Sequence, residues 1–182
     1  YGEGLDPLLR YRKNDLRGIV NGIDYDVYSP AQDEYIKYHY NISTFRKAKK
    51  KNKIYMQNKA GLPTGKNIFT VCIISRLTEQ KGLDLLIPMI NDFLRENVQL
   101  YILGGGEKRY EAIFASVKTR YPAQVFFDIN YSDEMAKYMY AGCDATLMPS
   151  KFEPCGLSQL MALRYGTCLL YTSDAADDLI GV

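Results

Sequence analysis

A regular alternation of two kinds of segment between residues 67 and 165 constrains this chain more than any other feature. Short runs of β-branched and other apolar residues alternate four times with longer segments in which apolar residues recur at helical spacing. The runs predicted as strands are 68–74, 98–104, 124–128 and 144–148. The segments predicted as helices are 82–97, 107–121, 133–141 and 157–165, and we expect Pro88 to kink or split the first of them.

Strands that alternate with helices over short connections predict a parallel sheet with helices on both faces. Right-handed crossovers make this a Rossmann-like α/β domain. The length of 182 residues accommodates one such domain and a connecting segment. Residues 46–59 are predicted to form a basic helix before the first strand, and residues 168–171 are compatible with a fifth strand.

The overall charge gives no reason to expect a nucleic-acid or membrane protein. The formal net charge is +2, and no apolar run approaches the roughly 20 residues that span a bilayer. Basic residues do gather in 45–53. We interpret them as a solvated helix face, with a polyanion-binding patch as the alternative, because no aromatic platform accompanies them in the sequence.

The four cysteines form no C-x-x-C pair, and the only histidine, His39, is distant from them in the sequence. This pattern argues against a zinc site and favours a reducing, cytoplasmic setting.

The loop that follows the first predicted strand carries two cations, Arg76 and Lys81. It lies at the carboxyl end of the predicted sheet, where open α/β folds bind ligands. An arginine fork and a lysine point charge suit a diphosphate, although two solubilising charges would look the same in the sequence. The glycines at 104–106 permit either a close approach to a ligand or an ordinary tight turn, and they match neither G-x-G-x-x-G nor a P-loop.

The segment 149–167 combines an acid, a thiol and a helix start. Glu153 and Cys155 lie in a short loop after the fourth predicted strand, and Gly156 opens the next helix. The N–H groups of a helix start suit a phosphate, while a carboxylate suits sugar hydroxyls or a developing positive charge. We interpret Cys155 as packing against the ligand or shaping the loop, and not as a nucleophile, because no base is near it in the sequence. Tyr131, after the third strand, is suited to stacking on a base, or is a half-buried loop tyrosine.

Several long motifs, in order, resemble those of bacterial glycogen synthases and plant starch synthases. They are SRLTEQKGLD at 75–84, LGGGE at 103–107 and AGCDATLMPSKFEPCGLSQLMALRYGT at 141–167, after a segment at 1–30 similar to the one that joins the two domains of these enzymes. The resemblance covers essentially residues 1–167. Met161, eight residues after Glu153, stands where many related glycosyltransferases have a second acid, and this favours glycogen and starch synthases over them.

The resemblance implies a GT-B fold, in which two Rossmann-like domains face each other across a cleft, with this chain as the truncated C-terminal, donor-binding half. It implies glucose transfer from ADP-glucose, or UDP-glucose, to the non-reducing end of an α-1,4-glucan, with retention and without a metal or other cofactor. It makes Arg76 and Lys81 catalytic residues that hold the diphosphate, and Glu153 a catalytic residue facing the donor glucose. The donor-binding residues that it implies are Tyr131, beside the base, and Cys155, Gly156 and Leu157.

The same resemblance predicts the domain organisation. Residues 1–45 are an interdomain linker region, 46–167 the nucleotide-sugar-binding domain, and 168–182 a non-native tail, because the match ends after Thr167. The family's first domain is missing, so we expect the chain alone to make no glucan. The alternatives are an inactive nucleotide-sugar-binding fragment and another retaining GT-B glycosyltransferase, such as a sucrose- or trehalose-type enzyme.

Overall fold

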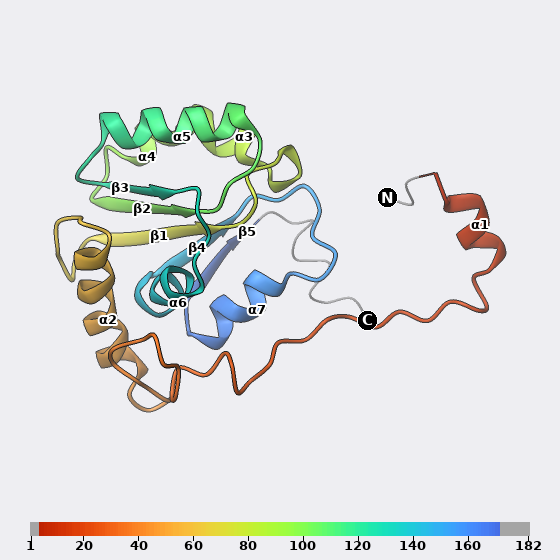
Figure 1. Ribbon diagram of the computed structural model, residues 1–182, viewed down its shortest axis with the longest axis horizontal. Helices are drawn as coiled ribbons and strands as arrows, with labels where there is room; N and C mark the ends of the chain where they lie inside the picture. Colours follow the sequence, from red (N-terminus) through yellow and green to blue (C-terminus); the bar gives the residue numbers. More distant parts are fainter. Residues whose placement is uncertain (1–3, 172–182) are drawn as a thin grey trace.

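A five-stranded parallel sheet forms the centre of the structure, which is a computed structural model describing residues 4–171 (Figure 1). The strands lie side by side in the order β3-β2-β1-β4-β5, and every neighbouring pair is parallel. In chain order they are β1 (Phe69–Ile74), β2 (Val98–Leu103), β3 (Val125–Asp128), β4 (Ala145–Met148) and β5 (Cys168–Tyr171). The four predicted strands are therefore present, and residues 168–171 do form a fifth.

Residues of β1 alternate between two apolar cores, one on each face of the sheet. Val71 and Ile73 belong to one core, Cys72 and Ile74 belong to the other, and all four are buried. Successive side chains of a strand point to opposite faces, so a run that is apolar at every position has to be covered twice.

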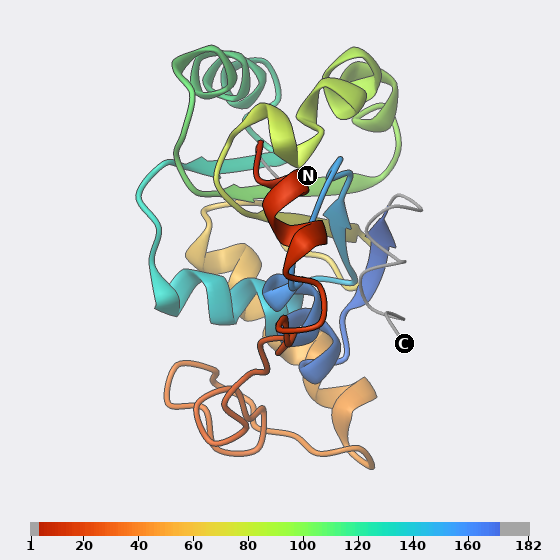
Figure 2. The same ribbon diagram turned by 90° about the vertical axis from the view of Figure 1, so that its right-hand side faces the viewer.

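Helices provide this cover on both faces (Figures 1 and 2). One face carries α3 (Leu83–Leu86), α4 (Ile90–Phe93) and α5 (Lys108–Arg120), and the other carries α2 (Phe45–Lys59), α6 (Asp133–Gly142) and α7 (Leu157–Arg164). The expected interruption at Pro88 is confirmed, because a 3₁₀ turn, Ile87–Met89, separates α3 from α4. Within residues 4–171, no helix is long and apolar enough to cross a membrane.

The part of the chain before α2 contains an exposed segment and a segment that packs on the domain. Residues 4–22, which include the short helix α1 (Asp6–Tyr11), are all exposed and run clear of the sheet (Figure 1). In contrast, Asp33, Ile36 and Tyr40 are buried, and the Tyr40 hydroxyl donates a hydrogen bond of 2.8 Å to the Tyr165 carbonyl at the end of α7. The predicted linker region 1–45 therefore contains a segment that packs on the domain.

The basic helix α2 differs from the solvated face predicted for it, because two of its lysines turn inward. Lys49 Nζ donates hydrogen bonds to the Tyr140 carbonyl (3.0 Å), the Tyr165 carbonyl (3.2 Å) and the Thr167 hydroxyl (2.8 Å). Lys53 is buried and pairs with the Asp144 carboxylate. The prediction is wrong for these two residues. Carbonyl groups at the ends of α6 and α7 attract Lys49, whereas the Asp144 carboxylate and the Ile68 carbonyl attract Lys53, and the local sequence pattern reveals neither set of partners.

The predicted non-native tail, 168–182, falls only partly within the described residues. Residues 168–171 pair in parallel with β4, whereas 172–182 lie outside the described residues. Cys72 and Cys143 are buried, as expected for cysteines that act as small apolar residues, and all four cysteines are free thiols.

Candidate functional site

The sheet changes direction of growth between β1 and β4. From β1 the chain proceeds to β2 and β3 on one side, while β4 and β5 are added on the other. The helices that follow β1 and β4 therefore lie on opposite faces of the sheet. The crevice beside the loops that lead to them is the usual ligand site of an open α/β sheet.

A pocket of about 580 Å³ opens at this point. It is lined by the loop after β1, the loop after β4, the start of α7 and the loop before α6. The structure brings together in this one lining all seven residues predicted from the sequence: Arg76, Lys81, Tyr131, Glu153, Cys155, Gly156 and Leu157.

Backbone contacts hold the two loops against each other. The Lys151 amide donates to the Gln80 carbonyl, and the Gln80 side-chain amide donates to the Phe152 carbonyl, both at 2.9 Å. Gly82 has φ +64°, and a Cβ atom there would lie 1.7 Å from the Pro149 carbonyl oxygen. Only glycine permits both this backbone conformation and this approach.

A buried ion pair occupies the wall of the pocket. Lys81 Nζ and the Ser150 hydroxyl, the latter at 2.8 Å, both donate to Oε1 of Glu153. The side chains of Lys81 and Glu153 are 15% and 8% exposed. A carboxylate so far removed from water requires such partners, so Ser150 fixes the orientation of Glu153. Ser150 was not predicted from the sequence, where its only signal is a hydroxyl three residues before the acid.

Arg76 differs from Lys81 in being exposed. Among residues 4–171 no carboxylate pairs with Arg76, although its side chain lines the same pocket. Its guanidinium is thus available to an anionic ligand, for which it offers a planar set of donors.

The start of α7 forms the floor beside this cluster. Gly156 adopts the left-handed conformation, with φ +58°, and precedes Leu157, the first residue of the helix. Cys155 is half-buried, and the only histidine, His39, lines a different hollow. The histidine is thus not placed to activate the Cys155 thiol, and the role of Cys155 in shaping the loop or packing against a ligand stays a prediction.

Tyr131 lines the pocket from the loop between β3 and α6 and is 57% exposed. Partial burial, together with the nearby Asp133 carboxylate, raises the pKa of Tyr131 above its usual value, so its phenol stays neutral. Asn21, from the exposed segment before α2, also lines the pocket. Its place in the pocket was not predicted from the sequence.

The glycines at 104–106 serve the neighbouring loop and do not line this pocket. A Cβ atom on Gly104 would lie 2.2 Å from the Ser75 carbonyl oxygen, and one on Gly106 would lie 2.3 Å from that of Leu77. These glycines therefore allow the loop after β2 to pack closely on the loop that carries Arg76.

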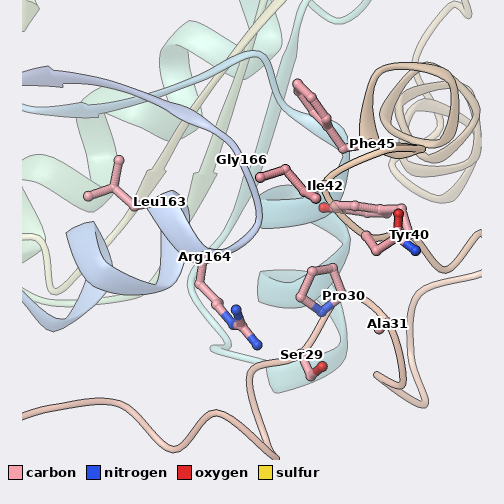
Figure 3. Close-up of a pocket in the computed structure, with 10 residues that line it drawn as sticks. Ser29, Pro30, Ala31, Tyr40, Ile42, Phe45, Leu163, Arg164 and Gly166 are labelled. Atoms are coloured by element: carbon pink, nitrogen blue, oxygen red, sulfur yellow. The ribbon is translucent and has the colours of Figure 1, made fainter.

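Another pocket, of about 410 Å³, lies between the segment around Pro30 and Tyr40 and the end of α7 (Figure 3). Of the described residues that line it, Arg164 is the only charged one, and none of the seven predicted residues is among them. The candidate site is therefore the pocket between the loops after β1 and β4, which we call the carboxyl-edge pocket.

Over most of its length the chain is similar to known proteins. The family described as glycosyl transferases group 1 matches residues 52–176. This chain belongs to that family. The residues of the carboxyl-edge pocket that follow β1 and β4 lie within the matched region.

The similarity extends to particular members. A glycogen synthase of Lachnospira eligens is 53% identical over 92% of this chain, and one of Thermotoga maritima is 44% identical over 97% of it. The catalytic domain of starch synthase IV from Arabidopsis thaliana, solved with ADP and acarbose, has a TM-score of 0.85 and 30% identity over 93% of this chain.

The similarity to glycogen and starch synthases inferred from the motifs is thus confirmed, as is the fold class of a Rossmann-like GT-B half. The chain spans 35% and 37% of the length of those two glycogen synthases, and 35% of the starch synthase chain.

Proposed function

We propose that this chain is the donor-binding part of a glycogen or starch synthase, which transfers glucose from ADP-glucose to the non-reducing end of an α-1,4-glucan with retention. The observation that carries the proposal is the meeting of Arg76, Lys81 and Glu153 in one pocket at the switch point of the sheet. The similarity to proteins named glycogen synthase, and to a starch synthase solved with ADP, supports it.

In this proposal the two cations act on the leaving group. Cleavage of the bond between glucose and the diphosphate leaves negative charge on the phosphate oxygens. Arg76 and Lys81 neutralise that charge from fixed positions, and the N–H groups at the start of α7 add to their effect. Tyr131 lies beside the base of the nucleotide.

Glu153 acts on the sugar. The transition state carries positive charge at the anomeric carbon, which a nearby carboxylate stabilises. Lys81 has three N–H donors, of which one is directed to Glu153. The other two are available to the diphosphate, so a single ammonium group links the leaving group to the residue that faces the glucose.

The domain assignment forms part of this proposal. Residues 46–167 bind the nucleotide sugar, and residues 1–45 lead to a second domain that supplies the other wall of the cleft and much of the glucan acceptor site. The four free thiols fit a cytoplasmic enzyme. We expect the 182-residue chain alone to form no glucan, which is tested by incubating it with radiolabelled ADP-glucose and an α-glucan primer.

Calorimetric titration with ADP tests the proposed donor site directly. We expect the chain to bind ADP, and each of Arg76→Ala and Lys81→Ala to weaken binding about tenfold or more, as expected for a lost charge-assisted contact. Lys66→Ala is the matched control, because Lys66 is exposed and does not line the pocket.

Equal affinity of all four proteins for ADP, or no binding of ADP by the folded wild-type chain, would overturn the proposal. A parallel titration with UDP tests the assignment of the base. Tighter binding of UDP and UDP-glucose would assign UDP-glucose as the donor in place of ADP-glucose.

A further inference from the structure

The surface around α2 carries lysines that form no ion pair within residues 4–171. Between Glu34 and Glu79 the sequence contains no Asp or Glu, while α2 alone contributes a run of lysines. Lys49 and Lys53 turn inward and are satisfied by the domain. Lys47, Lys50, Lys51 and Lys59 of the same helix are exposed.

Three outward lysines line one hollow of about 400 Å³. The hollow lies between the segment before α2 and the first turns of that helix, and Lys37, Lys47 and Lys51 line it together with Tyr38. The described lining includes no acidic residue. It also shares no residue with the carboxyl-edge pocket. In Figure 1, α2 lies at the left of the sheet, and the loops that follow β1 and β4 lie at the right.

Two of these lysines lie beside aromatic rings, one of which, Tyr38, also lines the hollow. Lys51 Nζ lies 5.2 Å from the centroid of the Tyr38 ring, and Lys37 Nζ lies 5.9 Å from the same centroid and 5.1 Å from that of Tyr55. Cation–π contacts of this length favour these positions. Neither lysine forms an ion pair with any of residues 4–171. Tyr38 and Tyr55 lie outside the basic run 45–53 in the sequence, and the fold brings them beside its lysine Lys51 and beside Lys37.

We propose that this hollow binds a small anion that carries at least two phosphate charges, such as a diphosphate or a bisphosphorylated metabolite. Like charges that line one hollow repel each other, and a polyvalent anion bound between them is attracted by all of them. The volume suits a small ligand. A nucleic-acid strand fits less well, because it needs an extended groove with exposed stacking faces, and here lysines lie over the rings.

The probe is inorganic pyrophosphate, titrated calorimetrically into the Arg76→Ala/Lys81→Ala protein so that the carboxyl-edge pocket does not contribute. We expect one pyrophosphate to bind per chain. Adding Lys37→Gln and Lys51→Gln should weaken it at least about tenfold, because two charged contacts are lost. The control is the addition of Lys50→Gln and Lys66→Gln, which removes the same charge from exposed residues outside the hollow.

Amide shift mapping on the unaltered chain gives a measurement that needs no substitution. Pyrophosphate should shift amides of residues 37–51 in addition to those of the carboxyl-edge pocket. Three results would each overturn the proposal: shifts confined to residues 75–82 and 149–157, an equal loss of affinity in the Lys50/Lys66 control, or tighter binding of a single-stranded oligonucleotide than of pyrophosphate through Lys37 and Lys51.

Discussion

Two regions of this chain hold carboxylates away from water. The two regions differ in whether all of their charged groups have partners among the described residues. In the seam where residues 29–40 pack against α6 and α7, the Asp33 side chain has no exposed surface. It accepts hydrogen bonds from the Tyr165 hydroxyl and the Tyr35 amide, and Lys137 Nζ lies 3.6 Å away. In the carboxyl-edge pocket, Glu153 has Lys81 and Ser150 at one oxygen, while Arg76 nearby has no carboxylate partner among the described residues.

The difference separates stability from binding. In the seam, the charged groups take their partners from the chain itself, so their loss should lower the free energy of unfolding. In the pocket, Arg76 has no carboxylate partner among residues 4–171 and remains available to a ligand. Loss of a group there should therefore change ligand affinity more than stability. Polar groups that a fold leaves incompletely paired in a concave site are candidates for ligand recognition.

The largest effect should come from Asp33→Ala. Removal of this carboxylate leaves the Tyr165 hydroxyl and the Lys137 ammonium without their buried partner, at a cost of about 3 to 5 kcal/mol in the free energy of unfolding. Urea unfolding measures it. Asp15→Ala is the control, since the pair of Asp15 with Arg12 is exposed and should contribute less than about 1 kcal/mol. Similar losses in the two variants would show that the seam is not held by its charges.

The second effect concerns pH and Lys49 of α2, whose ammonium group lies against the ends of α6 and α7. Burial lowers the pKa of Lys49 from 10.5 to about 8. Between these values the unfolded chain holds a proton that the folded chain has released, so stability should rise with pH across this window, by at most about 1.4 kcal/mol per pH unit. Below pH 8 both states are protonated and this contribution is constant. Urea unfolding of the wild type and Lys49→Met across the window should give different slopes, and parallel slopes would contradict the assignment.

The third effect is a change in binding affinity that has opposite signs for ADP and ADP-glucose, two proposed ligands of the carboxyl-edge pocket. In Glu153→Gln, the amide no longer competes with phosphate for Lys81, so ADP should bind about two- to threefold more tightly. ADP-glucose should bind less tightly than to the wild type, because its glucose loses a charged partner. Calorimetric titration measures both affinities. A shift of both in the same direction would place Glu153 away from the boundary between diphosphate and sugar.

The smallest effect should come from Ser150→Ala. Loss of the hydroxyl that orients Glu153 should weaken ADP-glucose about threefold and leave ADP unchanged. Ser150→Thr keeps a hydroxyl and should recover part of the loss. Equal weakening of both ligands in Ser150→Ala would mean that the substitution disturbs the loop and not the carboxylate alone.

Much of the fold follows from local pattern. The continuous apolar run of β1 and the proline within the segment 82–97 predicted a doubly covered strand and a split helix, and both are present. The grouping of Arg76, Lys81 and Glu153 also followed, because parallel strands direct their carboxyl ends to one edge. Lys49 and Lys53 were misjudged, since a run of lysines does not reveal which of them face helix ends or a buried acid.

The sequence by itself determined the class of the sheet, the order of its elements and the edge at which ligand-binding groups gather. Apolar periodicity and chain direction are sufficient for these, because both are local properties. Only the tertiary structure decided which charged groups find ion-pair or hydrogen-bond partners within the fold and which remain available to a ligand. Lys81 is joined to Glu153, 72 residues away, and Lys49 is joined to Thr167, 118 residues away. Packing brings together partners that are so distant in the sequence. Packing alone therefore distinguishes Lys49, which contacts the ends of two helices, from Lys81, which lines the pocket.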